Sequence, residues 1–195
     1  MDPIEEAVRV LKRDGLVVYP TETVYGLGAD AFSDDAIYRV YEAKRRPPAE
    51  PLSIAVSDYE MICSVARVDE CAQEFIEAFL PGPVTAVLPA RSCLPEVLSG
   101  GTGMIGIRYP AHEVPVRIVT GLDAPITATS ANQHGGREPT TPQECHVPYD
   151  FLIDGGRLPG TPSTVVDLVH RVIIREGINS DEIRAFLATA GVQVK

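Results

Sequence analysis

The stretch LVVYPTETVYGLG, residues 16–28, places a short apolar run directly before a segment rich in threonine and glycine. The apolar run, residues 16–19, predicts a strand that ends at Pro20. The following residues, 20–28, predict a turn that exposes hydroxyl and backbone N–H groups, although an ordinary strand-to-loop connection would have the same composition. The spacing excludes a Walker A loop and a dinucleotide-binding fingerprint.

Helices are expected on both sides of this stretch. Asp2 and Pro3 are typical of a helix start, and the next helix, residues 34–44, stops before the prolines at 47 and 48. Further along the chain the same alternation continues, with strands expected at 52–56, 84–88, 104–109, 126–129, 151–153, 164–168 and 171–175, and helices at 69–80, 113–119 and from Ser180. This order predicts one α/β domain over residues 1–195, built around a mixed sheet flanked by helices.

Composition narrows the class of protein. The chain has 195 residues, of which 45% are hydrophobic and 23% charged, as expected for a globular domain. Its net charge of −10 disfavours binding to duplex nucleic acid or to an anionic membrane, unless a local basic patch overrides it. The four cysteines have no C-x-x-C spacing, and neither a signal peptide nor an apolar span of membrane length is evident. We therefore expect a soluble cytoplasmic protein with reduced thiols and no membrane partner.

Cations are clustered in one short segment, Lys44-Arg45-Arg46, which follows the second predicted helix. In an extended segment alternate side chains point the same way, so Lys44 and Arg46 would share a face and Arg45 would turn outward. Two cations on one face suit a polyphosphate. A solvated helix end with basic residues that complement the helix dipole is the other interpretation, and the triplet alone does not decide between them.

Polar residues also follow several predicted strands. Ser130 and Asn132 come after one strand and before Gly135-Gly136, Arg108 and Arg175 end two others, and Ser163 opens a further one. Hydroxyl, amide and guanidinium groups at strand ends favour a small anionic ligand, although turn formation and structural ion pairs would use the same residues. The histidines have no metal-ligand spacing, so no protein-built metal site is predicted.

Several motifs occur together in one order. They are YPTETVYGLGADAF (residues 19–32), K-x-R at Lys44 and Arg46, PGPVTAVL (81–88), GIRYPAH (106–112), S-x-N at Ser130 and Asn132, STVVD (163–167) and the terminal IIREG. In this combination the chain resembles the YrdC/Sua5 family of L-threonylcarbamoyladenylate synthases over nearly its whole length. The resemblance implies a twisted α/β sheet, related to the DHBP-synthase-type fold, around an open, positively lined concave cavity.

The resemblance also implies an activity and roles for individual residues. L-Threonine, bicarbonate or CO₂, and ATP would give threonylcarbamoyl-AMP and pyrophosphate, with Mg²⁺ carried mainly by the nucleotide. The product would pass to a downstream tRNA threonylcarbamoyl-transfer complex for t6A37 modification, and contact with tRNA or double-stranded RNA would be weak. The implied ATP-binding residues are Lys44 and Arg46, which are also the catalytic candidates, with Glu50, Ser130, Asn132 and Arg175; the implied threonine-binding residues are Thr23, Arg108, Ser163 and the backbone of Ala128.

Two positions depart from the family pattern N-P-L-x-x-H. Glu50 stands where the family often has an asparagine that helps to bind ATP, and Ala55 stands where it often has a histidine near threonine. A carboxylate beside a triphosphate is unfavourable unless Mg²⁺ bridges them. The alternatives are therefore a paralogue that uses a different carbamoyl acceptor or is inactive, an RNA- or nucleotide-binding module, and a carbamoyltransferase domain as in hydrogenase maturation.

Overall fold

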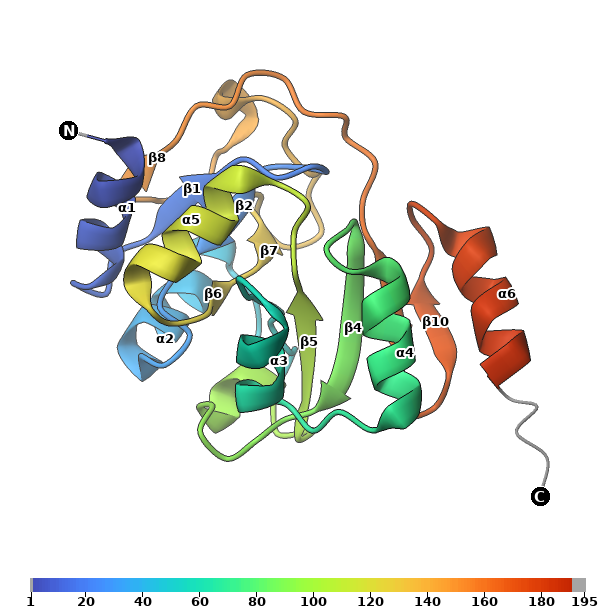
Figure 1. Ribbon diagram of the computed structural model, residues 1–195. Helices are drawn as coiled ribbons and strands as arrows, with labels where there is room; N and C mark the ends of the chain where they lie inside the picture. The colour runs from blue at the N-terminus through green and yellow to red at the C-terminus, as the bar shows by residue number, and fades with distance from the viewer. Residues whose placement is uncertain (1, 191–195) are drawn as a thin grey trace.

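Two β-sheets form the framework of the computed structural model, which describes residues 2–190 (Figure 1). The smaller sheet has the strand order β7-β2-β1-β8, and the larger has the order β10-β9-β4-β5-β3-β6. The mixed α/β class predicted from the sequence is confirmed. The expectation of one continuous sheet is replaced by two sheets, because the chain changes sheet partners at Ala128.

The four-stranded sheet contains the stretch with which the sequence analysis began. Its strands are β1 (Val17–Tyr19), β2 (Gly26–Gly28), β7 (Thr129–Ser130) and β8 (Phe151–Leu152). Strand β1 pairs antiparallel with β2 and parallel with β8. Gly26 and Gly28 of β2 lie against the ring of Tyr19, where an added Cβ would come within 2.8 and 2.9 Å of ring atoms. The glycines therefore allow the tyrosine ring to cross its partner strand.

The six-stranded sheet supplies the opposite side of the molecule. Its strands are β3 (Ile54–Ala55), β4 (Val84–Pro89), β5 (Met104–Arg108), β6 (Ile126–Thr127), β9 (Thr164–Asp167) and β10 (Val172–Arg175). Strand β4 pairs antiparallel with β5 and parallel with β9, and β3 pairs parallel with β5. The carboxyl end of β5 and the start of β9 therefore face the same end of the sheet.

Helices cover these sheets on their outer sides (Figure 1). They are α1 (Pro3–Leu11), α2 (Asp34–Lys44), α3 (Tyr59–Val65), α4 (Glu70–Phe79), α5 (Glu113–Leu122) and α6 (Ser180–Ala190), with 3₁₀ turns at Glu96–Ser99 and Pro142–Glu144. Carboxylate or hydroxyl groups of Asp2, Ser33, Asp58 and Asp69 accept backbone N–H bonds at the starts of the first four helices, which satisfies donors that the helices leave open. No helix among residues 2–190 is long and apolar enough to cross a bilayer.

Packing joins the helices to the sheets through two apolar clusters. Helices α1 and α5 contact each other and bury Leu11 and Ile118 against Val17 of β1. At the other end, Phe186 of α6 packs edge-on against Phe75 of α4, with ring centroids 5.5 Å apart. Each burial of an apolar side chain of this size contributes about 1.5–3 kcal/mol relative to exposure. These contacts fix the outer walls and leave the junction between the sheets to polar groups.

The junction itself is a short crossing segment. Thr127 ends β6 in one sheet and Thr129 begins β7 in the other, so Ala128 is the residue at which the chain crosses. Thr127 anchors the crossing: its carbonyl accepts from the Tyr19 hydroxyl at 3.0 Å, and its hydroxyl donates to the Leu27 carbonyl at 3.0 Å. The predicted single strand at 126–129 is therefore wrong. Strand β2 and helix α3 were also absent from the sequence-based expectation.

Candidate functional site

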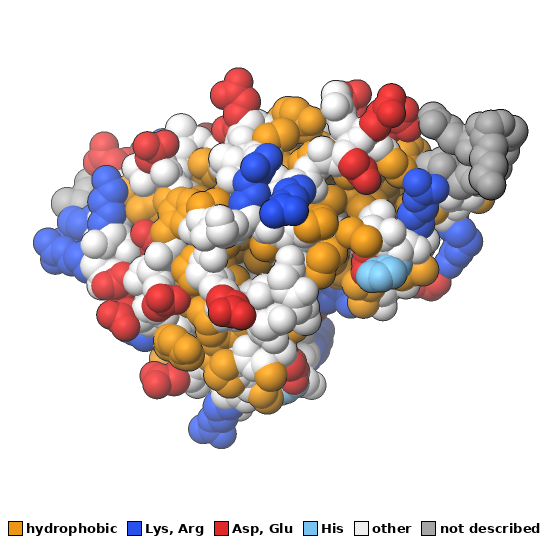
Figure 2. All heavy atoms as spheres, turned by 90° about the horizontal axis from the view of Figure 1, so that it is seen from below, with side chains coloured by type: hydrophobic (Ala, Val, Ile, Leu, Met, Phe, Trp, Pro, Cys, Tyr) orange, Lys and Arg blue, Asp and Glu red, His pale blue; other side chains and the backbone are white. Residues whose placement is uncertain are grey.

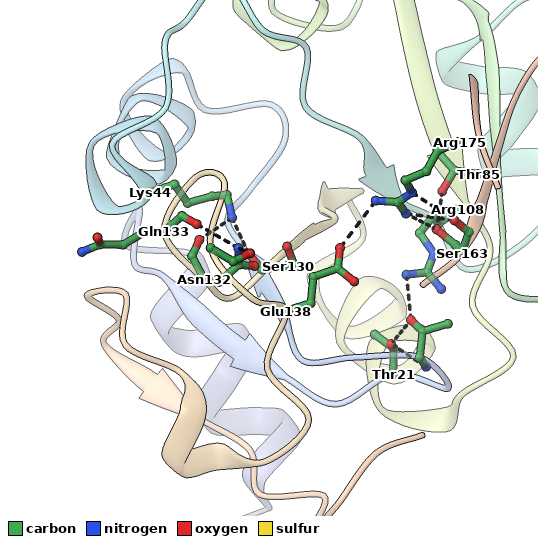
Figure 3. Close-up of polar contacts among 12 residues, drawn as sticks. Thr21, Lys44, Thr85, Arg108, Ser130, Asn132, Gln133, Glu138, Ser163 and Arg175 are labelled. Carbon is green, nitrogen blue, oxygen red and sulfur yellow. Dashed lines mark hydrogen bonds and ion pairs between the residues drawn. The ribbon is translucent and has the colours of Figure 1, made fainter. Parts of the chain in front are cut away.

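A cavity of about 360 Å³ opens between the two sheets. The crossing segment, the loop after β1 and the C-terminus of α2 line one side, and the ends of β5, β9 and β10 line the other. Four cationic side chains and one carboxylate are among its described lining residues: Lys44, Arg46, Arg108, Arg175 and Glu138. In Figure 3 these side chains form two groups with Glu138 between them. We call them the Lys44 group (Lys44, Arg46, Ser130, Asn132) and the Arg108 group (Thr23, Thr85, Arg108, Ser163, Arg175).

Lys44 is the centre of the first group. It is the last residue of α2, is only 2% exposed, and its ammonium donates to the carbonyls of Ser130 and, at 2.7 Å, of Asn132. Burial, and secondarily the charge of Arg46, lowers the pKa of Lys44 to about 8, while the carboxylate of Glu138 acts in the opposite direction. A buried ammonium held only by neutral carbonyls retains an unneutralised positive charge that an anionic ligand would stabilise.

Arg46 reaches the same cavity through a turn. Arg45 caps α2 in the left-handed conformation, with φ of 52°, and its side chain is exposed, whereas Arg46 is half-buried. The Arg46 Nη2 atom donates to the carbonyl of Pro51 at 2.8 Å. The expectation that Lys44 and Arg46 share a face and that Arg45 points outward is confirmed. The reason given for it, an extended segment, is wrong because Lys44 is helical and the chain reverses at Arg45.

Asn132 completes the Lys44 group. Its Nδ2 atom donates to the carbonyls of Gln133 and Gly136, both at 2.8 Å, which fixes the loop that follows β7. Its Oδ1 atom is buried and has no hydrogen-bond partner. An unsatisfied buried acceptor is costly, so Asn132 offers an acceptor position to a ligand donor.

Arg108 is the centre of the second group and ends strand β5. It is 8% exposed, and its Nη2 atom lies 2.6 Å from Oε1 of Glu22. Its Nη1 atom lies 3.4 Å from the hydroxyl of Thr23, which in turn lies 2.9 Å from the hydroxyl of Thr21. The guanidinium is therefore held in place by a carboxylate and two hydroxyl groups at the wall of the cavity.

Arg175 lies in this second group and not beside Lys44. Its Nη2 atom donates to the carbonyl and hydroxyl of Ser163 at 2.9 and 3.0 Å, and the Ser163 hydroxyl lies 3.2 Å from that of Thr85. The resemblance implied a nucleotide role for Arg175 and an amino-acid role for Ser163. The structure brings the two side chains into direct contact, so the two implied roles meet at this point.

Ala128 and Glu50 differ in their relation to the cavity. Ala128 lines it, and the Ala128 N–H donates to the carbonyl of Ser53 at 2.7 Å. Glu50 is not among the lining residues: its carboxylate lies 3.5 Å from the Arg46 guanidinium and 3.4 Å from the His134 imidazole. Ala55 is fully buried in β3. Glu50 therefore acts on the cavity through the cation that it contacts.

The sequence analysis did not single out three side chains of the cavity: Thr85, His134 and Glu138. His134 and Glu138 flank Gly135-Gly136, which had been noted only as a turn, so the proximity of this turn to the S-x-N motif was the available signal. Among residues 2–190, no three or more His, Cys, Asp or Glu side chains gather as a metal-binding group. Figure 2 shows acidic, basic and apolar side chains intermingled on the face seen from below.

Comparison with known proteins identifies the family. The Sua5/YciO/YrdC family, described as "Telomere recombination", matches residues 9–177. The threonylcarbamoyl-AMP synthase of Pyrococcus abyssi is 39% identical over 89% of this chain and 54% of the relative, and that of Klebsiella pneumoniae is 31% identical over 90% and 96%. The chain thus spans about half the length of the first relative.

A solved structure agrees with this result. The crystal structure of P. abyssi Sua5 complexed with L-threonine superimposes with a TM-score of 0.90 at 36% identity, covering 94% of this chain and 56% of that one. The sequence match and the shared fold agree over nearly the whole chain. The chain belongs to the Sua5/YciO/YrdC family.

Proposed function

We propose that this chain is an L-threonylcarbamoyladenylate synthase, which joins L-threonine, bicarbonate or CO₂, and ATP and releases pyrophosphate. The observation that carries the proposal is a single cavity with two separate cationic groups, one around Lys44 and one around Arg108. A reaction between a polyphosphate and an amino acid needs two anion sites that face one another. The names of the relatives and the L-threonine bound to P. abyssi Sua5 support the same assignment.

The Lys44 group is proposed to bind ATP. Lys44 and Arg46 supply the charges for the phosphates, and Ser130 and Asn132 supply hydroxyl and amide groups. Glu50 is proposed to act at ATP through Arg46, since its carboxylate contacts that guanidinium. The shortage of carboxylates in the cavity suits Mg²⁺ bound through the nucleotide's own oxygens.

The Arg108 group is proposed to bind L-threonine. Arg108 would hold the carboxylate, Thr23 and Ser163 the hydroxyl, and the Ala128 backbone would line the same pocket. Arg175, which contacts Ser163, would lie where the two substrates meet. This places the amino acid opposite the phosphates, on the far wall of the cavity.

The chemistry then depends mainly on position and charge. The neutral amine of threonine adds to CO₂ with loss of a proton and gives a carbamate; the carbamate oxygen bonds to the α-phosphorus as the bond to pyrophosphate breaks. Lys44 and Arg46 would stabilise the charge that develops on the phosphates. Holding the two reactants in attack geometry can be worth roughly 7–11 kcal/mol. The product would feed t6A37 modification of tRNA in the cytoplasm.

Pyrophosphate release tests the proposal. Purified protein is incubated with ATP, Mg²⁺, bicarbonate and one amino acid at a time. We expect release with L-threonine, less with L-serine and least with L-valine, because a site built to bond a hydroxyl discriminates more strongly against its loss than against the loss of a methyl group. Equal release with all three, or release without any amino acid, would contradict the proposal.

A further inference from the structure

An α-amino acid brings a positive charge as well as a negative one into the cavity. Its ammonium group needs an oxygen acceptor once it leaves water. Among the described residues that line the cavity, Glu138 has the one carboxylate. Glu22 is the other carboxylate near the Arg108 group, but it is not a lining residue and its Oε1 atom is bonded to Arg108 at 2.6 Å.

Glu138 lies between the Lys44 group and the Arg108 group (Figure 3). Its Oε1 atom is 3.5 Å from Nη1 of Arg175, and Nη2 of the same guanidinium donates to the Ser163 hydroxyl at 3.0 Å. On the opposite side its charge acts on the ammonium of Lys44. Its carboxylate therefore occupies the space between the two anion sites.

The reaction requires the amino-acid nitrogen to be in this space. The nitrogen carries the carboxylate that attacks the α-phosphorus, so it must point from the threonine site toward the nucleotide. The backbone beside Glu138 is held in place because the carbonyl of Pro139 accepts the Tyr25 N–H at 3.0 Å. Arg175 makes three hydrogen bonds to Ser163, so it stays fixed when the carboxylate of Glu138 turns to another cation.

We propose that Glu138 binds the α-ammonium group of the amino-acid substrate and so makes the cavity selective for zwitterionic α-amino acids. This inference rests on the proposed function and adds a residue to it. In the free protein the carboxylate contacts Arg175, and on binding it accepts hydrogen bonds from the substrate's ammonium group.

The experiment compares two ligands and two charge states of the side chain. L-Threonine and 3-hydroxybutyrate, which is threonine without its amino group, are titrated by calorimetry into wild-type protein and into Glu138→Gln. We expect the variant to bind L-threonine roughly 10- to 100-fold more weakly, as for loss of a charge-assisted hydrogen bond. Its affinity for 3-hydroxybutyrate should be unchanged or higher, since the variant lacks a negative charge that repels the carboxylate.

Further variants separate recognition from structure. Glu138→Asp keeps the charge and should retain part of the affinity for L-threonine. Glu74→Gln, an exposed change on α4, is the matched control and should alter neither ligand. Melting curves of all variants should coincide with that of the wild type, because Arg175 remains bonded to Ser163.

Each outcome bears on the inference. An unchanged affinity of Glu138→Gln for L-threonine, or an equal loss for both ligands, would overturn it. If the wild type also releases pyrophosphate with threonine in that case, the proposed function stands and only the role of Glu138 fails. If the wild type binds no α-amino acid at all, both fail.

Discussion

The Lys44 group and the Arg108 group both bring a buried cation to the wall of one cavity, but they compensate its charge differently. Lys44 donates to two backbone carbonyls and has no carboxylate partner at hydrogen-bond distance. Arg108 lies 2.6 Å from the carboxylate of Glu22, and both of these side chains are at least 84% buried, with exposures of 10% and 16%. One charge is left for a ligand to neutralise, and the other is already paired.

This difference teaches how one cavity can hold two anionic substrates in separate places. A polyphosphate carries several negative charges and is bound best where the protein charge is unneutralised. A carboxylate carries one charge, and a guanidinium fixed by its own counterion still presents further N–H donors in a defined orientation. The comparison predicts that the two groups respond differently to substitution and to pH.

The largest effect is expected for Arg108→Ala. The change removes the proposed carboxylate ligand and also leaves Glu22 buried without a partner, which costs about 3–5 kcal/mol of unfolding free energy. Denaturant unfolding measures this loss, and calorimetry with L-threonine should show no binding. The double variant Arg108→Ala/Glu22→Gln should recover most of the stability and none of the threonine binding; recovery of both would refute the role of Arg108.

A smaller effect is expected for Lys44→Ala. The substitution removes a charge-assisted contact to the phosphates, so affinity for ATP should fall roughly 10- to 150-fold. Affinity for L-threonine should change little, because the Arg108 group is intact. Calorimetric titration with each ligand checks this, and a variant that loses threonine as strongly as ATP would show that the cavity is not divided.

The third prediction concerns pH and again separates the two groups. Burial lowers the pKa of Lys44 to about 8, so the free protein holds this charge below pH 8 and loses it as the pH rises. ATP affinity should be constant between about pH 6.5 and 7.5 and then fall, approaching tenfold per pH unit above the pKa of Lys44. Threonine affinity measured over the same range should not follow this curve. A Lys44→Arg variant whose ATP affinity falls in the same way would assign the change to another group.

The same pKa shift has a consequence for folding. Because the folded-state pKa of Lys44 is below its usual value, the unfolded chain binds the proton more tightly, and stability should rise as the pH increases through the interval above 8. Denaturant unfolding of wild-type protein and Lys44→Met across that interval measures the contribution. A variant that keeps the wild-type pH slope would contradict it.

The smallest effects distinguish neighbouring arginines. Arg46→Ala should weaken ATP binding roughly tenfold, since its half-buried guanidinium faces the cavity. Arg45→Ala removes an exposed charge, usually worth under about 1 kcal/mol, and should be nearly silent. Equal losses in the two variants would show that the left-handed turn at Arg45 does not separate their side chains when ATP is bound.

Much of this arrangement could be predicted from local sequence. Proline and capping residues delimit α1 and α2, and short apolar runs predict β1, β4 and β5 within a few residues. The cation pair of Lys44 and Arg46 was also predicted to face one ligand. These features depend on neighbours in the chain, so local patterns contain the information.

The remaining features depend on contacts between distant residues. Strand β2 is three residues long and contains two glycines, so it has no strand propensity of its own and forms because Tyr19 packs across it. The change of sheet at Ala128 follows from pairing with β3 and β2, which lie more than 70 residues earlier. Glu138 has no periodic or motif signal, and only the folded loop places it between the two groups.

A crystal structure with L-threonine and a non-hydrolysable ATP analogue tests the division of the cavity most directly. We predict the triphosphate at Lys44 and Arg46 and the amino-acid carboxylate at Arg108, with the α-phosphorus and the amino nitrogen facing each other beside Glu138. A triphosphate bound at Arg108 and Arg175, or an amino acid bound at Lys44, would contradict the account.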